Sequence, residues 1–364
     1  MKDLLFSKVI SIFIRLLLII DKHGRVISHY IAKTISENSD NYCHFKLRPH
    51  KSDAFRKSKI KSAISCHQLA IVIQGLPELR DNFTLESIRL YKIIFPGSHI
   101  IISTWDSVDE TILKRFGEEG CSLVINKSFP ECGFGNVNYQ ICTTYNGLLK
   151  AKELGAEFAI KCRSDLRIYR EFAFEYLKSL MELLPVEDNH LCTRGRIVTL
   201  SAGQGQLFYP NWLQDYFYFG YTDDLINLFS IPYDSRHISG SSGNYLKKKY
   251  HPCTAADMCN EEVPEVFITK RFLEKNIEVI DTIESWWEIL RKYFIIINDD
   301  DINAFWNKYD QYSLNLRNCE YDGTYSFEDK KKNINFASFL AIKTRSIKYE
   351  DWMEDCRKEL IIFK

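Results

Sequence analysis

An aspartate between two arginines closes the apolar run FAIKCRSDLRIY, residues 158–169. Arg163 and Arg167 are the cations, and Asp165 lies between them, directly after Ser164. Guanidinium groups can bind phosphate oxygens in a bidentate manner, and a carboxylate can bind a divalent cation or a ribose hydroxyl. These residue types at this spacing predict a site for a phosphate-bearing ligand. A purely structural ion pair is the alternative.

A parallel sheet must position this cluster, because strand-like apolar runs alternate with segments of helical periodicity before it. The strand-like runs are LAIVIQG (69–75), HIIISTW (99–105), SLVINK (122–127) and the run beginning at Phe158. The helical segments are 81–95, 107–117 and 136–155, and Gly155 closes the last of them as a C-terminal cap. The alternation predicts an α/β fold with helices on the faces of the sheet.

The carboxyl ends of parallel strands meet at one edge of a sheet, where ligands bind in open α/β folds. Besides residues 163–165, this rule selects Gln74 and Gly75 at the end of the first strand and Thr104, Trp105 and Asp106 at the end of the second. The glycine would let a ligand approach the backbone closely. Asp106 is equally suited to capping the helix at 107–117. The start of the next helix adds two polar residues that either face the ligand or are merely solvated, Asn138 and Gln140.

Acidic residues in the second half of the chain are further candidates. Asp215 precedes a strongly aromatic strand within residues 212–229. Glu262 and Glu265 lie near the start of a predicted helix in 259–275, where acids are also favoured for purely structural reasons. Three consecutive aspartates, 299–301, could hold Mg²⁺ for phosphoryl transfer, but a solvated turn or a helix cap is the favoured interpretation.

The N-terminal residues 1–66 combine an apolar helix with 13 Lys and Arg against 5 Asp and Glu. Segment 4–20 has polar residues at helical spacing and a wide apolar face, and seven cations follow within 46–61. An amphipathic helix on an anionic membrane surface fits this pattern best. Packing on the protein's own core and a single transmembrane anchor are the alternatives. No nucleic-acid recognition module accompanies the charge, so we expect no nucleic acid partner.

Cysteine usage indicates the compartment. The chain has eleven cysteines and no C-x-x-C pair, and several cysteines fall in apolar, strand-like runs. This pattern favours buried free thiols over disulfides or a zinc site. We therefore expect a cytoplasmic protein that is peripheral on the inner face of the plasma membrane.

Four motifs in order resemble the WavE-type lipopolysaccharide synthesis proteins: IVIQG (71–75), STWD (103–106), the helix from NVNYQ to NGLLKA, and KCRSDLRIY (161–169). The resemblance covers roughly residues 68–290. It implies a bacterial glycosyltransferase with a GT-A-like, Rossmann-type mixed sheet flanked by helices. It also implies a nucleotide-sugar donor and a glycan or lipid-linked acceptor in lipopolysaccharide or capsule biosynthesis.

The resemblance gives the candidate residues roles. Those expected to bind the donor are Gln74, Gly75, Asp106, Asn138, Gln140, Arg163, Ser164, Asp165 and Arg167. The expected catalytic acids are Asp215, Glu262 and Glu265, with Glu265 ranked first as the base that deprotonates the acceptor hydroxyl. GT-A enzymes usually hold Mg²⁺ or Mn²⁺ with a D-x-D motif, but Arg163 replaces the first acid here. Asp165 is then the predicted metal ligand, and an arginine without a metal is the alternative for neutralising the leaving diphosphate.

The expected organisation has three parts. Residues 1–66 form the membrane-associating helix and basic linker, 67–290 the GT-A-like domain, and 291–364 a C-terminal helical extension packed on that domain. Two other functions stay open. The aspartates 299–301 would serve a sugar-phosphate transferase, and a chain that kept only the fold would be a non-catalytic glycan-binding protein.

Overall fold

The computed structural model describes residues 2–21, 24–40, 42, 46–55, 65–188, 190–201, 209–238, 242–250, 255–307, 334–347 and 350. The chain divides into two compact units, residues 1–54 and 55–364. The predicted boundaries at residues 66 and 290 stay a prediction. Cysteines in the described ranges are free thiols.

The smaller unit contains two helices, α1 (Lys2–Ile20) and α2 (Arg25–Asn38), so the helix predicted over 4–20 is present. Asp21 ends the first helix and accepts a hydrogen bond from the Ile27 amide, which turns the chain into the second. Large apolar side chains are exposed along α1, among them Val9, Ile12, Phe13, Leu16, Ile19 and Ile20. Within the described ranges, no helix is both long and apolar enough to cross a membrane.

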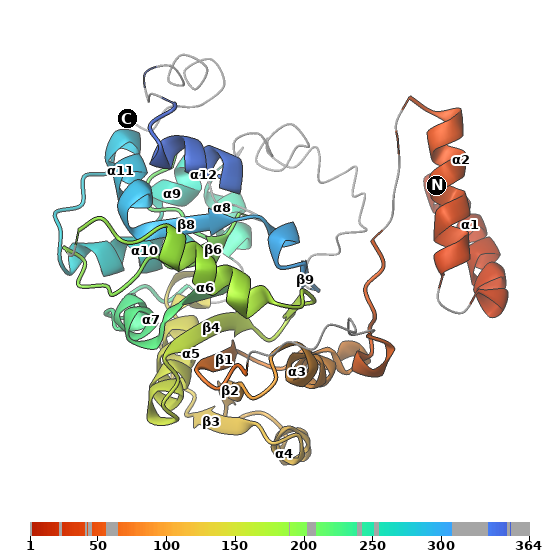
Figure 1. Ribbon diagram of the computed structural model, residues 1–364, viewed down its shortest axis with the longest axis horizontal. Helices are drawn as coiled ribbons and strands as arrows, with labels where there is room; N and C mark the ends of the chain where they lie inside the picture. The colour runs from red at the N-terminus through yellow and green to blue at the C-terminus, as the bar shows by residue number, and fades with distance from the viewer. Residues whose placement is uncertain are drawn as a thin grey trace. The chain divides into compact units, whose positions relative to one another are not determined.

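The larger unit is built on a seven-stranded sheet of order β3-β2-β1-β4-β7-β6-β8 (Figure 1). Its strands are β1 (Leu69–Gln74), β2 (His99–Trp105), β3 (Ser122–Asn126), β4 (Phe158–Arg163), β6 (Ile197–Leu200), β7 (Phe217–Tyr221) and β8 (Phe294–Ile297). Only β7 runs antiparallel to its neighbours, β4 and β6. This topology confirms the predicted α/β fold with a mixed sheet. Strand β8 shows that the sheet extends past residue 290.

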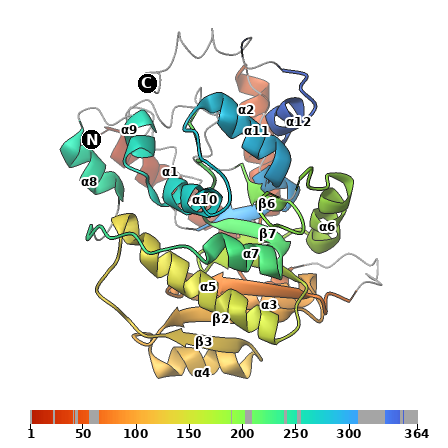
Figure 2. The same ribbon diagram turned by 90° about the vertical axis from the view of Figure 1, so that its left-hand side faces the viewer.

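Helices cover both faces of this sheet, as expected for strands that are apolar along their whole length. Figures 1 and 2 show α5 (Val137–Glu153) and α7 (Thr222–Phe229) on one face and α3 (Phe83–Ile94) on the other. The remaining helices are α4 (Glu110–Glu118), α6 (Ala173–Leu183), α8 (Ser242–Lys249), α9 (Ala255–Asn260), α10 (Pro264–Glu274), α11 (Ile283–Tyr293) and α12 (Phe336–Lys343). A two-stranded antiparallel sheet pairs β5 (Leu166–Ile168) with β9 (Ala304–Trp306).

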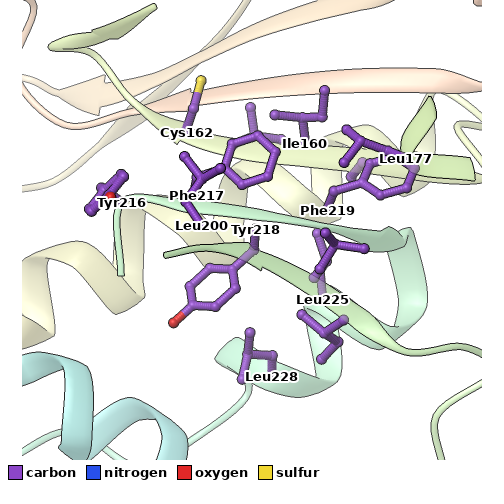
Figure 3. Close-up of a cluster of buried hydrophobic side chains, with 14 of the residues drawn as sticks. Ile160, Cys162, Leu177, Leu200, Tyr216, Phe217, Tyr218, Phe219, Leu225 and Leu228 are labelled. Atoms are coloured by element: carbon purple, nitrogen blue, oxygen red, sulfur yellow. The ribbon is translucent and has the colours of Figure 1, made fainter. Parts of the chain in front are cut away.

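Helix α5 packs closely on β1 and β2, beside the sheet edge where ligands are expected. A Cβ at Gly147 would overlap Val72 Cγ1 and lie 3.1 Å from Ser103 Cβ, so only glycine allows this approach to β1 and β2. Helix α5 ends as predicted, because Gly155 follows it with φ of 77°. Figure 3 shows the core beside β4 and β7, where Cys162 and Tyr218 point to opposite sides of the sheet.

Candidate functional site

A cavity of about 590 Å³ lies at the carboxyl edge of the parallel strands. It is lined by eight of the residues predicted for donor binding or catalysis: Gln74, Gly75, Gln140, Arg163, Ser164, Asp165, Asp215 and Glu265. Segments far apart in the sequence therefore converge there, from the end of β1 to the start of α10. The structure keeps Asp106, Asn138, Arg167 and Glu262 outside this lining.

Arg163 and Asp165 form a fork at the end of β4. The guanidinium Nε donates to Oδ1 and Nη2 donates to Oδ2, both at 3.0 Å. The same guanidinium lies 5.5 Å from the ring centroid of Trp306. The structural ion pair considered from the sequence is thus present, and it also holds Arg163 in one orientation at the cavity wall.

Hydrogen bonds also hold the end of the neighbouring strand, β1. The Ser164 amide donates to Gln74 O at 3.1 Å, and the Ser164 hydroxyl donates to Leu76 O. Gly75 has φ of 102°, a conformation that strongly favours glycine. The Gln74 side chain is nearly buried, and its Oε1 accepts from the Thr143 hydroxyl at 2.9 Å. Gln74 is therefore anchored to α5.

Asp215 lies just before β7 and is only 6 % exposed. Its backbone oxygen accepts from Gln140 Nε2 at 3.0 Å and from the ammonium of Lys161. Gln140 is thus bound to the chain rather than pointing only at a ligand. From the described part of the chain, no hydrogen bond or ion pair reaches the Asp215 carboxylate. This carboxylate combines burial at the cavity with freedom to bind a substrate group.

The two glutamates of the 259–275 segment differ in location. Glu265 lies in the first turn of α10, directly after Pro264, and both residues line the cavity. Glu262 precedes the helix and forms ion pairs with Lys270 at 3.1 Å and Arg271 at 2.7 Å. Those contacts hold Glu262 in the wall of a second cavity of about 410 Å³.

Asp106 does not cap the helix that follows it. Helix α4 begins at Glu110, and its N-cap is Asp109, whose carboxylate accepts from the Thr111 amide at 2.8 Å. Asp106 is exposed and accepts instead from the Ser128 hydroxyl at 2.8 Å. The capping interpretation was therefore wrong by three residues, because the chain makes a turn before the helix starts.

Asn138 and Arg167 are buried hydrogen-bonding residues of the fold. The Asn138 amide donates to Glu131 O and Asp234 O, both at 2.8 Å, and its Oδ1 accepts from the Asp234 amide. Arg167 is 2 % exposed and donates to Ser87 Oγ at 2.8 Å and Phe83 O at 2.7 Å. Neither side chain faces the cavity.

The described cavity lining also contains aromatic residues: the carboxyl-edge rule selected Trp105 from the sequence, whereas Tyr139 and Trp306 were not predicted as site residues. Trp105 and Tyr139 contact each other edge to face, with ring centroids 5.3 Å apart. Trp306 stacks on Tyr216 at 4.4 Å and comes from β9, which pairs with β5 through Leu166. Trp306 gave no local signal, because a long-range strand pairing brings it to the site.

The charged residues of the cavity lining indicate how a metal ion could bind there. Among the described residues, four carboxylates and one guanidinium line the cavity: Glu78, Asp165, Asp215, Glu265 and Arg163. Across the described ranges, no group of three or more His, Cys, Asp or Glu is arranged to hold a metal by itself. The oxygen donors fit Mg²⁺ or Mn²⁺ only as a cation that is shared with the phosphates of a ligand, a common arrangement for Mg²⁺.

The aspartates at 299–301 form a short 3-10 helix outside the cavity lining. Asp301 accepts from the Asn298 amide at 2.8 Å, and Asn298 caps the turn in return. This reciprocal arrangement is a capping box, which is the structural interpretation favoured from the sequence.

Comparison with solved structures gives matches of low sequence identity. A mannose-1-phosphate geranyltransferase from Thermus thermophilus is 13% identical, with a TM-score of 0.31, and the match covers 58% of this chain and 72% of that one. A cytidylyltransferase from Leptospira borgpetersenii serovar Hardjo-bovis is 12% identical, with a TM-score of 0.33 and coverage of 82% and 99%. A glycosyltransferase involved in the glycosylation of the major capsid of PBCV-1 is 12% identical, with a TM-score of 0.26 and coverage of 64% and 81%. Because every score is below 0.5, we take no function from these structures.

Comparison by sequence is more specific. No curated protein matches the chain at a significant level. The family described as WavE lipopolysaccharide synthesis matches residues 69–321, which is well over half of the 364 residues. The match includes β1, α5, β4 and every predicted site residue. The chain therefore belongs to the WavE lipopolysaccharide synthesis family.

Proposed function

We propose that this protein is a glycosyltransferase that moves a sugar from a nucleotide-sugar donor to a lipid-linked or surface glycan acceptor. Family membership supports a role in sugar transfer. The observation that carries the proposal is the cavity at the carboxyl edge of the sheet, which joins an anion-binding group, Arg163, to the carboxylates Asp215 and Glu265.

The two kinds of residue match the two halves of the reaction. The Arg163 guanidinium binds the donor diphosphate, and Gln74 and Gly75 border the nucleoside end. The acceptor oxygen bonds to the anomeric carbon while the bond from that carbon to the diphosphate breaks. The proton of the acceptor hydroxyl passes to a carboxylate, for which we propose Asp215. Glu265, in the first turn of α10 at the cavity wall, orients the acceptor.

We further propose that Mg²⁺ or Mn²⁺ binds with the donor, with Asp165 as its ligand from the protein and the diphosphate oxygens as others. The acidic lining supports this, since one guanidinium offsets little of the charge of a diphosphate next to four carboxylates. A bound divalent cation would stabilise the charge on the departing diphosphate.

The first test is turnover of purified full-length protein with a panel of nucleotide sugars, with Mn²⁺ or with EDTA. We expect one donor to release nucleoside diphosphate, and EDTA to lower the rate at least ten-fold if the cation absorbs leaving-group charge. Release of nucleoside monophosphate would instead indicate a sugar-phosphate transferase. Glycan binding without turnover of any donor would favour a non-catalytic protein.

We also propose that α1 binds the protein to an anionic membrane surface, where a lipid-linked acceptor would lie. Its exposed apolar side chains and the basic residues that follow in 46–61 support this. Deleting residues 1–22 should release the protein from vesicles that contain anionic lipid in a flotation assay, and Phe13→Ser should weaken binding in the same direction. Equal binding of the deletion variant and the full chain would count against this role of α1.

A further inference from the structure

Lys161 is a fully buried lysine in the middle of the sheet. It lies in β4, where its neighbours across the strand pairs are Val72 of β1 and Tyr218 of β7. Its relative exposure is 0 %. Side chains alternate along a strand, so Lys161 shares its side of β4 with Arg163, whereas Cys162 faces the other side. Figure 3 shows the same alternation, with Cys162 and Tyr218 on opposite sides.

The ammonium of Lys161 bonds to the backbone rather than to an acid. Its Nζ donates to Asp215 O and lies 5.7 Å from the ring centroids of Tyr218 and Phe229. Within the described ranges, no carboxylate forms an ion pair with it. A buried charge that lacks an ion-pair partner is unfavourable for folding, so its presence calls for another role.

Asp215 O receives two donors from two different elements. Lys161 reaches it from β4, and Gln140 Nε2 reaches it from α5 at 3.0 Å. The backbone just before β7 is thereby fixed between the sheet and the helix. The carboxylate of the same residue has no such contact to the described chain. The two donors thus fix the backbone from which this carboxylate extends.

Burial lowers the pKa of Lys161 from 10.5 to about 8, against the opposing effect of the Asp215 carboxylate. The other charged and titratable groups that act on the ammonium are Arg163, Cys162 and Asp165. Lys161 therefore keeps its proton at neutral pH but holds it less firmly than an ordinary lysine. The ammonium is the stronger hydrogen-bond donor of its two forms.

We propose that Lys161 is a positioning residue: together with Gln140 it holds the backbone of Asp215 so that the carboxylate of Asp215 reaches the reacting acceptor hydroxyl. This rests on the proposed function, in which Asp215 is the base. It also gives Gln140, predicted as a donor-binding residue, a role in placing Asp215.

The test is Lys161→Met, which keeps a long unbranched side chain and removes the charge. We expect kcat to fall at least ten-fold, since a small misplacement of a reacting group is enough for that, with KM for the donor changed less than about two-fold. We expect the variant to be at least as stable as wild type at pH 7, because the buried charge is gone. Lys114→Met removes an exposed lysine of α4 and should change neither quantity.

The pH dependence of the free energy of unfolding tests whether Lys161 is buried as an ammonium. Below about pH 8 the folded and unfolded wild type both carry the proton, so the burial penalty is present in full. Between about pH 8 and 10.5 only the unfolded chain keeps it, so the penalty is relieved and wild type gains stability relative to Lys161→Met over that range. If the difference in free energy of unfolding between wild type and Lys161→Met does not change with pH, Lys161 is not buried as an ammonium.

A double variant tests the shared carbonyl. If Lys161 and Gln140 act on one oxygen, Lys161→Met and Gln140→Leu together should lower kcat by less than the product of their separate effects. If kcat of the double variant falls by the full product of the two separate effects, the joint role is overturned. A Lys161→Met variant with kcat within two-fold of wild type, or one that loses kcat and stability together, would also overturn it.

One readout does not depend on the proposed function. Crystal structures of wild type and Lys161→Met compare the position of the Asp215 carbonyl directly, and we expect a shift of about 1 Å, the displacement that suffices to impair catalysis. An unmoved carbonyl would overturn the positioning role even in an active enzyme. If wild type turns over no nucleotide sugar, the proposed function fails, and the carbonyl position still decides the role of Lys161.

Discussion

Replacing Asp215 by asparagine should lower kcat by roughly 10²- to 10⁴-fold, the usual contribution of a general base. The change keeps the size of the side chain and the backbone oxygen that Lys161 and Gln140 hold. It removes the negative charge and the ability to accept a proton, but no group that we assign to donor binding. Affinity for the donor should therefore change little. Single-turnover rates with saturating donor and acceptor, together with the Kd of the donor by calorimetry, measure the two effects separately.

Two variants serve as controls for this result. Asp223→Asn makes the same change on α7, where the carboxylate is exposed and paired with Lys152 at 2.8 Å, and should leave kcat unaltered. Glu265→Gln should raise KM for the acceptor more than it lowers kcat. If Glu265→Gln abolishes turnover and Asp215→Asn retains it, the base is Glu265, as the sequence ranking had it.

Replacing Arg163 by glutamine should weaken binding of a nucleoside diphosphate roughly 10- to 100-fold, since hydrogen bonds to charged groups are worth about 1.5–3 kcal/mol. Arg163 is the guanidinium of the described cavity lining, and its fork with Asp165 holds it in place. Arg163→Lys should restore only part of the affinity, because an ammonium cannot bind in a bidentate manner. Calorimetry with the nucleoside diphosphate measures the Kd of each variant.

The matched control is Arg170→Gln, which removes an exposed arginine outside the cavity lining. It should leave the Kd within about two-fold of wild type, as for most surface substitutions. Thermal unfolding of Arg163→Gln is needed alongside, because Asp165 loses its partner in that variant. Unchanged affinity in a folded Arg163→Gln protein would remove Arg163 from the donor site.

Most of the central sheet could be predicted from the sequence. The strands at 69–75, 99–105, 122–127 and from Phe158 are present, and the long helix before Gly155 packs against them. Apolar runs and helical periodicity are local properties, and each side chain contributes to them through its immediate neighbours. The carboxyl-edge rule then placed the ends of the first and fourth of these strands correctly at one cavity.

The site was predicted less completely, because polarity does not tell where a side chain points. Arg163 and Arg167 look alike in the sequence, yet Arg163 lines the cavity and Arg167 is buried against Phe83 and Ser87. The difference arises because the chain turns between β4 and β5. Glu262 and Glu265 separate in the same way, since the helix begins between them and Arg271 holds Glu262 elsewhere.

The family, the order of strands and helices, and the sheet edge at which polar strand ends gather could all be inferred from the residues alone. This inference was possible because motifs and periodicity depend on residues that are neighbours in the chain. The set of side chains that share the cavity depends on how distant segments pack together. Trp306 arrives there through the pairing of β5 with β9, and Asp215 is held there by Lys161 and Gln140. Such contacts join residues far apart in the chain, and their geometry depends on how whole elements pack.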